Sequence, residues 1–244
     1  MTLEGIPAGK RIDYEKLFEF MQRRAPGKNA YSTPRKEADA PEFLSGVVGD
    51  TTCGTPITAV IMNTTTRSSD YDIIKDIPRP GHADYAGSVK YNQKDLRNKL
   101  ERSSARKTAI EVAVGAIAKL VLKTIGITGT SEVTQIGSSC CPDKFHEEID
   151  LTKEKGDSIG GKFSVVYKNI PVGLGSHVHW DRGIDGRLAQ VLMSIPAIKA
   201  VEIGDNPLGL CGSEYHDEFE IKDGEVCRTT NHAGGVEGGM TKGQ

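Results

Sequence analysis

The chain of 244 residues is long enough to bury a hydrophobic core as one large domain or two small ones. Its 31 basic and 33 acidic side chains give a formal net charge of −2, so no basic excess indicates nucleic acid as the main partner. No run of eighteen apolar residues occurs and the N-terminus lacks an apolar signal segment, so we expect neither a membrane span nor a signal peptide.

The cysteines fit reduced thiols and a cytoplasmic location. There are five of them, an odd number, and no CxxC pair occurs, which argues against a disulfide framework and a zinc ribbon. The 28 glycines fall mostly in turn-like places and show no G-X-Y period, which indicates a loop-rich globular protein.

In the first half of the chain we expect a helix, a strand and a long loop. Residues 13–25 read as a helix because Leu17, Phe18 and Met21 share one face and Pro26-Gly27 stops it. Residues 55–64 are apolar and β-branched, which predicts a buried strand. Residues 67–95 are expected to be mostly loop, and connections of that length are usually functional or disordered.

The strongest predicted helix covers residues 103–126, where an Ala-rich apolar stripe suits packing between layers and Gly126 can close the helix. Further on we expect a strand, then a helix that Pro196 stops and a short strand after it, then a hairpin that turns at Asp223-Gly224. These elements cover residues 162–173, 185–205 and 218–230.

A single histidine lies in the loop "RPGHADYAG", residues 79–87. Pro78, Pro80 and Gly81 stop regular structure, so we expect His82 on an irregular loop. Such a histidine either bonds within its own loop or transfers protons near neutral pH. Local sequence leaves both interpretations open.

The segment "LERSSARKTA", residues 100–109, opens the predicted long helix. Ser103 or Ser104 can cap it, and Arg102 and Arg106 flank its first turn. A helix start with two arginines favours an anion such as phosphate. The alternative is ordinary serine capping beside solvated arginines.

Three further motifs are weaker signals. In "SHVHWD", His177, His179 and Asp181 would share one face of a strand as metal ligands can, but the flanking glycines favour a loop. The run "NHAGGVEGG", residues 231–239, either lets the backbone approach a ligand closely or forms a flexible turn. "RRAPG", residues 23–27, ends the first helix with two cations, which commonly stabilise a helix C-terminus.

Together these pieces resemble the chorismate synthase family, in the family's order and over nearly the whole chain. The matching segments are "RRAPG", "EFLSGVVGDTTCGTPI", "RPGHADYAGSVKY", "LRNKLERSSARKTA", "GDSIGGKFSVVYKNIPVGLGSHVHWDRGID", "LMSIPAIKAVEIGD" and "NHAGGVEGGM". The resemblance implies an α+β fold, a β-α-β sandwich, and conversion of 5-enolpyruvylshikimate 3-phosphate to chorismate and phosphate. It also implies reduced FMN as cofactor, NADPH as a reductant, a cytoplasmic homotetramer, and no metal in "SHVHWD".

The resemblance also implies roles for particular residues. His82 matches an acid/base histidine of the family. Arg102, Ser103 and Ser104 match a flavin-binding segment, and Pro196, Ala197 and Gly238 match further flavin contacts. Arg24 matches a position that binds the nicotinamide nucleotide or the substrate phosphate.

The sequence also departs from the family pattern. Lys107 stands where the family commonly has Glu, and Ala30 where some members have a second nucleotide-contacting Arg. We expect residues 1–244 to be a single domain that lacks the family's N-terminal Gly-Glu-Ser-His-Gly motif and its C-terminal Arg-His-Asp motif. Expressed alone, such a chain should bind FMN weakly and make little chorismate. The alternatives are an inactive fragment that serves binding or assembly, and an unrelated phosphate-ligand or metal hydrolase built on "SHVHWD".

Overall fold

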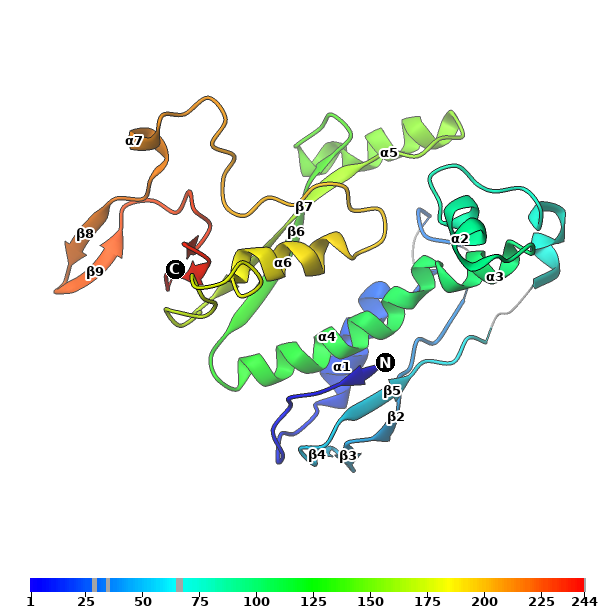
Figure 1. Ribbon diagram of the computed structural model, residues 1–244, viewed down its shortest axis with the longest axis horizontal. Helices are drawn as coiled ribbons and strands as arrows, with labels where there is room; N and C mark the ends of the chain where they lie inside the picture. Colours follow the sequence, from blue (N-terminus) through cyan, green and yellow to red (C-terminus); the bar gives the residue numbers. More distant parts are fainter. Residues whose placement is uncertain (28–29, 34–35, 65–67, 244) are drawn as a thin grey trace. The chain divides into compact units, whose positions relative to one another are not determined.

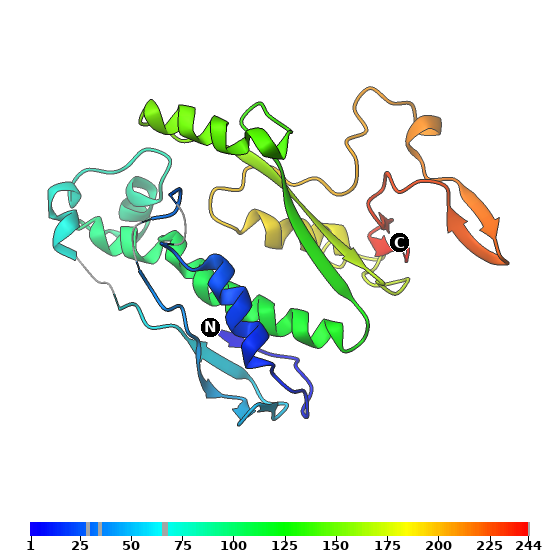
Figure 2. The same cartoon turned by 180° about the vertical axis from the view of Figure 1, so that it is seen from behind.

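The computed structural model describes residues 1–27, 30–33, 36–64 and 68–243. The chain forms two compact units, Met1–Val121 and Leu122–Gln244, each of which has its own helices and strands (Figures 1 and 2). The predicted α+β class is therefore confirmed.

The first unit is built on a three-stranded antiparallel sheet in the order β1-β5-β2, beside a short β3-β4 pair. Four helices and two 3-10 turns complete it. The bounds are β1 Thr2–Leu3, α1 Tyr14–Arg24, β2 Glu42–Ser45, β3 Val47–Val48, β4 Thr51–Thr52, β5 Ile57–Val60, η1 Ser68–Ile74, α2 Asp84–Tyr91, α3 Arg97–Arg102, η2 Ala105–Lys107 and α4 Thr108–Lys123.

The core of this unit lies where α1 and α4 meet the sheet. Leu17 and Met21 of α1 share one buried cluster with Ala113 and Ala116 of α4, whose small side chains let the two helices come close. Phe43 of β2 packs against the same cluster. Full burial of Leu17 and of Met21 stabilises the fold by roughly 1.5–3 kcal/mol each. This packing fixes the C-terminal end of α1 and the start of α4, where site residues lie.

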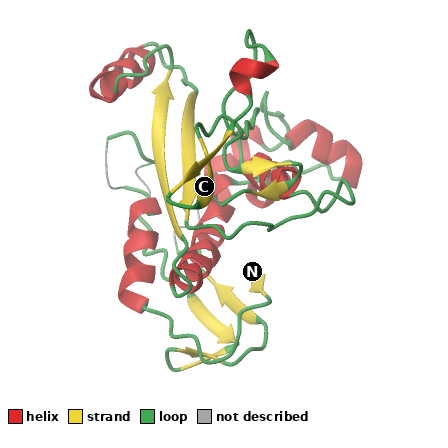
Figure 3. Ribbon diagram, turned by 90° about the vertical axis from the view of Figure 1, so that its left-hand side faces the viewer, coloured by secondary structure: helices red, strands yellow, loops and turns green. Residues whose placement is uncertain are grey.

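The second unit contains a long antiparallel pair, β6 and β7, which Figure 3 shows side by side. A turn and α5 lie between these strands in sequence, and two short hairpins follow later in the chain. The bounds are β6 Thr128–Ile136, η3 Pro142–Lys144, α5 Phe145–Glu154, β7 Gly161–Lys168, α6 Ile184–Met193, α7 Gly212–Tyr215, β8 Phe219–Lys222, β9 Glu225–Arg228, β10 Val236–Glu237 and β11 Met240–Thr241.

Several predicted elements are confirmed. The first helix occupies α1, where the Asp13 side chain caps the N–H of Lys16 at 3.1 Å. The predicted strands appear as β5 and β7, both shorter than expected. The predicted hairpin is β8–β9, and both turn residues, Asp223 and Gly224, have the positive φ that a tight hairpin turn requires.

Two expectations are wrong. Residues 67–95 are not mostly loop, because α2 begins at Asp84 directly after the Pro-Gly break and carries that acidic residue at its favourable N-terminal end. No strand follows Pro196 before residue 205 in the described chain. The backbone N–H of Asp205 donates one hydrogen bond to His232 O, but the left-handed backbone at Gly204 bends the chain before it. The two segments therefore do not pair as β-strands.

Candidate functional site

A buried carboxylate, Asp39, joins two arginines in the first unit. Arg24 Nη1 donates to Asp39 Oδ2 at 2.6 Å, and Arg106 Nη1 lies 2.5 Å from Asp39 Oδ1 as an ion pair. The Asp39 side chain is fully buried, whereas 21% of the Arg24 side chain stays exposed. One carboxylate therefore ties the end of α1 to the turn that precedes α4.

Further polar groups surround this arginine cluster. Glu37 Oε2 accepts from the Thr64 hydroxyl at 2.5 Å and lies 3.9 Å from Arg106 Nη2. Buried Arg106 Nε has no hydrogen-bond partner among the described residues. Asp39 and Glu37 balance the charges of the two arginines. Arg106 is therefore paired within the protein. The sequence had suggested an arginine that binds an anion or one that lies in solvent, and neither description fits Arg106. The same carboxylate, Asp39, also holds Arg24.

The segment from Arg102 to Ser104 is a junction between two helices. The helix predicted over residues 103–126 is present with Ser104 as its cap, because η2 at Ala105–Lys107 runs directly into α4, which ends at Lys123. Arg102 lies outside it and ends a separate helix, α3. The backbone N–H and the hydroxyl of Ser103 both donate to Lys99 O, at 2.8 and 2.6 Å. Ser104 Oγ accepts from the N–H of Arg106 at 3.2 Å and caps η2. Serine side chains that bond to nearby backbone interrupt a helix in this way.

The two serines therefore differ in what they can offer a ligand. Ser103 has used both of its donors, whereas Ser104 acts as an acceptor and keeps its hydroxyl proton. Arg102 is exposed, and no carboxylate among residues 1–27, 30–33, 36–64 and 68–243 is paired with it. A hydroxyl proton and an exposed guanidinium two residues apart in sequence are groups of the kind that bind a phosphate.

His82 lies on an exposed loop that an ion pair holds in place. Arg79 Nε donates to Asp84 Oδ2 at 2.8 Å and Arg79 Nη2 donates to Asp84 Oδ1 at 3.0 Å. Asp84 is 2% exposed, and the Arg79 guanidinium beside it holds the pKa of that carboxyl below its usual range. His82 Nδ1 lies 3.2 Å from Arg79 Nη2, so the ring is anchored at one nitrogen.

Two groups lie near Nδ1 of His82: the donor Arg79 Nη2 at 3.2 Å and the acceptor Asp84 Oδ1 at 3.6 Å. With the shorter contact made as a hydrogen bond, Nδ1 accepts from the guanidinium and the proton of the neutral ring lies on Nε2. His232 in the second unit has the opposite arrangement, since its Nδ1 lies 2.8 Å from the acceptor Asp205 Oδ2. In this arrangement Arg79 holds Nδ1 of His82, and Nε2 carries the proton of the neutral ring.

The other predicted cofactor residues lie in the second unit. Pro196 and Ala197 form a turn after α6, where Ala197 has φ +70°. A left-handed backbone costs a non-glycine residue about 1–2 kcal/mol, and such strain collects at functional positions. Gly238 has φ +55° in the β10–β11 turn, and a Cβ there would meet nothing within 4 Å. The surface above Gly238 is therefore open to a flat ligand.

Asp217 is the most densely bonded carboxylate of the second unit. Its Oδ1 accepts from the Thr230 hydroxyl at 2.6 Å and from the N–H of His232 at 2.7 Å, and its Oδ2 accepts from the N–H of Ala233 at 3.1 Å and from Lys242 Nζ. Burial alone would raise the pKa of Asp217, but the hydrogen bonds from Lys242, Thr230 and the backbone outweigh it. The pKa therefore lies well below its usual value of 3.8.

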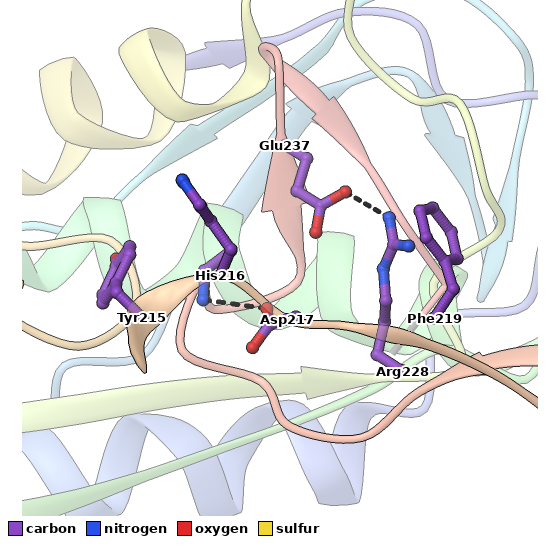
Figure 4. Close-up of a pocket in the computed structure, with 7 residues that line it drawn as sticks. Tyr215, His216, Asp217, Phe219, Arg228 and Glu237 are labelled. Carbon is purple, nitrogen blue, oxygen red and sulfur yellow. Dashed lines mark hydrogen bonds and ion pairs between the residues drawn. The ribbon is translucent and has the colours of Figure 1, made fainter. Parts of the chain in front are cut away.

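A pocket of about 290 Å³ opens beside Asp217 (Figure 4). On one wall the guanidinium of Arg228 stacks on Phe219, 3.3 Å from the ring centroid, and pairs with Glu237. None of the site residues predicted from the sequence lines this pocket, whose walls are formed by Tyr215, His216, Asp217, Phe219, Arg228, Ala233 and Glu237.

The segment "SHVHWD" forms the predicted loop, and His177, His179 and Asp181 are exposed there. No group of three His, Cys, Asp or Glu side chains among the described residues is placed to hold a metal ion. All five cysteines are free. None of the helices in the described part of the chain is long and apolar enough to cross a membrane.

Comparison with known proteins gives one consistent result. A family model described as chorismate synthase matches residues 1–244. The chain belongs to the chorismate synthase family. Chorismate synthases are lyases of aromatic amino acid biosynthesis, and they eliminate phosphate from 5-enolpyruvylshikimate 3-phosphate in an anti-1,4 sense to give chorismate.

Several chorismate synthases are similar over the whole chain. The protein of Thermoanaerobacter pseudethanolicus is 45% identical over 255 residues, which cover 99% of this chain and 71% of the relative. Those of Carboxydothermus hydrogenoformans and Methanosarcina barkeri are 40% and 39% identical, and each match covers all of this chain and 73% of the relative. A crystal structure of chorismate synthase matches with a TM-score of 0.83 and 39% identity, over 99% of this chain and 76% of that one. This likeness confirms the predicted fold type.

Sequence reasoning missed three buried carboxylates that contact predicted site residues or the segments that carry them: Asp39, Asp84 and Asp217. Each is buried and meets partners that lie up to 67 positions away in sequence, as Asp39 does with Arg106. An Asp in a polar stretch gives no local signal of such partners. Only Asp84 stood near a residue already selected, His82.

Proposed function

We propose that this chain carries out the chorismate synthase reaction with reduced FMN, and that the residues predicted from the family resemblance form its working parts. His82 acts in proton transfer. Arg102, Ser103, Ser104, Pro196, Ala197 and Gly238 belong to the flavin-binding segments, and Arg24 binds a phosphate of the substrate or of a nicotinamide nucleotide. The observation that carries the proposal is His82, which an arginine holds at Nδ1 on an exposed loop.

The residues present fit a phosphorylated flavin. Ser104 retains a hydroxyl proton and Arg102 an exposed charge, and both groups suit the phosphate. Gly238 leaves open space over its backbone. Ala197 has a strained left-handed backbone, and such strain is typical of functional positions. Ser103 belongs to the same segment but contributes to the fold alone, through its two hydrogen bonds to Lys99 O. When bound, reduced FMN supplies electron density that assists loss of phosphate without net redox change.

The chain's own residues then have separate tasks. Departure of phosphate breaks a C–O bond and leaves negative charge on the leaving group, which Arg24 stabilises electrostatically. Asp39 fixes one side of the Arg24 guanidinium, so its exposed side meets the phosphate without reorganisation. His82 offers its Nε2 proton at a fixed place in the loop.

The family resemblance, rather than the geometry, supports three further proposals. These are NADPH as the source of electrons for the flavin, a homotetrameric assembly, and a cytoplasmic location.

The test is anaerobic turnover of 5-enolpyruvylshikimate 3-phosphate with reduced FMN, followed by chorismate absorbance. His82→Ala should slow kcat by about a hundredfold or more, the usual contribution of a general acid or base, without unfolding the chain. His179→Ala changes an exposed loop histidine and serves as the matched control. The comparison is made in a chain that turns over, and equal rates for the parent and His82→Ala there would refute the proposed role of His82.

A further inference from the structure

The glycine-rich segment, residues 231–242, is closed into a loop by one side chain that lies outside it. Asp217 accepts backbone hydrogen bonds from His232 and Ala233 near the start of the segment. It also pairs with Lys242 Nζ at the end of the segment. The carboxylate has no exposed surface, and only 6% of the Lys242 side chain is exposed. Gly238 lies between the two tied ends.

A second set of contacts holds the start of the segment from another direction. Gly204 and Gly234 approach so closely that a Cβ on Gly204 would lie 2.1 Å from His232 O, and one on Gly234 would lie 2.4 Å from Gly204 N. Tyr215 stacks on His232 at 5.9 Å, and the Tyr215 hydroxyl donates to His232 O at 3.3 Å. The start of the segment is therefore rigid, and the path of the chain toward Gly238 depends on where its far end is tied.

Asp217 can hold both ends of the segment because all four of its contacts are made by donors. A buried carboxylate is tolerated only when hydrogen bonds and an opposite charge compensate its loss of water. The Thr230 hydroxyl, two backbone N–H groups and an ammonium group supply that compensation. Removing the negative charge leaves the buried Lys242 ammonium with one carboxylate among the described residues, Glu237 Oε1 at 3.7 Å. The end of the segment should then move.

We propose that Asp217 is a positioning residue for the reaction, which sets the shape of the glycine-rich segment so that Gly238 is presented to the flavin. The inference rests on the proposed function, because it takes Gly238 as a flavin contact. Asp217 touches neither flavin nor substrate in this account and acts only through the segment that it closes.

The test compares Asp217→Asn with Asp223→Asn in this chain. Asp223 is an exposed residue of the β8–β9 turn with φ +54°, a conformation that asparagine adopts readily, so it is a matched control. Two quantities are measured: amide hydrogen exchange of residues 231–242 and the Kd for reduced FMN. Asp217→Asn should speed exchange in this segment but not in β6 or β7, and should weaken FMN binding at least tenfold. Asp223→Asn should behave as the parent.

Each other outcome gives a decision. Faster exchange with FMN affinity within twofold of the parent would make Asp217 merely structural and overturn the inference. Unchanged exchange would show that the carboxylate does not hold the segment, and would also overturn it. A parent chain that binds no FMN would instead refute the proposed function and with it the flavin part of this inference. If Asp217→Asn does not fold, Lys242→Gln replaces it. That variant removes the one charged donor of Asp217 and should give the same pattern with a smaller change.

Discussion

Ser103 and Ser104 are adjacent, yet the structure gives them different hydrogen-bonding roles, and exchanging each for alanine separates stability from flavin binding. Ser103 has committed both of its donors to Lys99 O. Ser104 accepts a capping hydrogen bond from Arg106 N–H and retains its hydroxyl proton. Ser103→Ala should therefore affect the fold alone, and Ser104→Ala should affect both the fold and the ligand.

The expected sizes follow from these bonds. Ser103→Ala loses one neutral hydrogen bond, which costs about 0.5–1.5 kcal/mol of the free energy of unfolding. Ser104→Ala loses an N-cap worth about 0.5–2 kcal/mol, so the two variants should melt at similar temperatures. Ser104→Ala also loses a hydrogen bond to a charged phosphate, about 1.5–3 kcal/mol, which raises the Kd for FMN by roughly 10- to 150-fold.

The assay is titration of FMN into each variant, read by quenching of flavin fluorescence, beside thermal unfolding of the same samples. Unfolding serves as the internal control, because similar losses of stability with very different values of Kd exclude a general loosening of the α3–α4 junction. If Ser103→Ala weakens FMN binding as much as Ser104→Ala does, the hydroxyl proton is not the deciding feature and the reasoning fails.

Three other predictions follow from the buried carboxylates and their partners. Arg79→Gln should remove the guanidinium at His82 Nδ1 and leave Asp84 Oδ1, 3.6 Å away, as the nearest charged group. Nitrogen NMR should then show the proton of the neutral His82 ring moving toward Nδ1, while His232, held by Asp205, keeps its Nδ1 proton. An unchanged His82 tautomer would contradict the role of Arg79. Asp39→Ala should lower the free energy of unfolding, measured by denaturant titration, by about 3–5 kcal/mol, because the buried guanidinium of Arg106 loses its nearest partner. A loss below about 1 kcal/mol would show that the ion pairs of Asp39 do not stabilise the fold. The folded-state pKa of Asp217 lies below its unfolded value of 3.8, so its contribution to stability is complete above about pH 4 and is lost as the pH falls below that value. The loss of stability on acidification should be smaller in Asp217→Asn than in the parent, and identical acid profiles would refute it.

Local sequence was enough for elements whose causes are local. The helix Tyr14–Arg24 has its cap at Asp13 and its stop at Pro26-Gly27 within one short stretch. The Asp223-Gly224 turn carries its own conformational preference. The family motifs likewise identified the chain as a chorismate synthase, which the comparisons confirm.

The errors have longer-range or competing causes. Residues 103–126 have a helical pattern throughout, but Ser103 and Ser104 bond to nearby backbone, so helical structure begins at Ala105 with a 3-10 turn. Arg106 seemed available to an anion because its partner Asp39 is 67 positions away. The roles of His82, Arg24 and the flavin residues stay predictions, as does the single domain over residues 1–244.

Buried carboxylates give both units a common way to hold functional groups still. A lone buried carboxylate would cost several kcal/mol, so each of these is compensated by donors that it then fixes in place. Asp39 fixes two guanidinium groups, Asp84 fixes Arg79 and through it the ring of His82, and Asp217 fixes the ends of the glycine-rich segment. Because the compensation needs every donor, the geometry cannot drift without a large loss of stability. Reactions that depend on groups placed before the substrate arrives need this kind of rigidity, since the protein then spends no energy on reorganisation when negative charge develops.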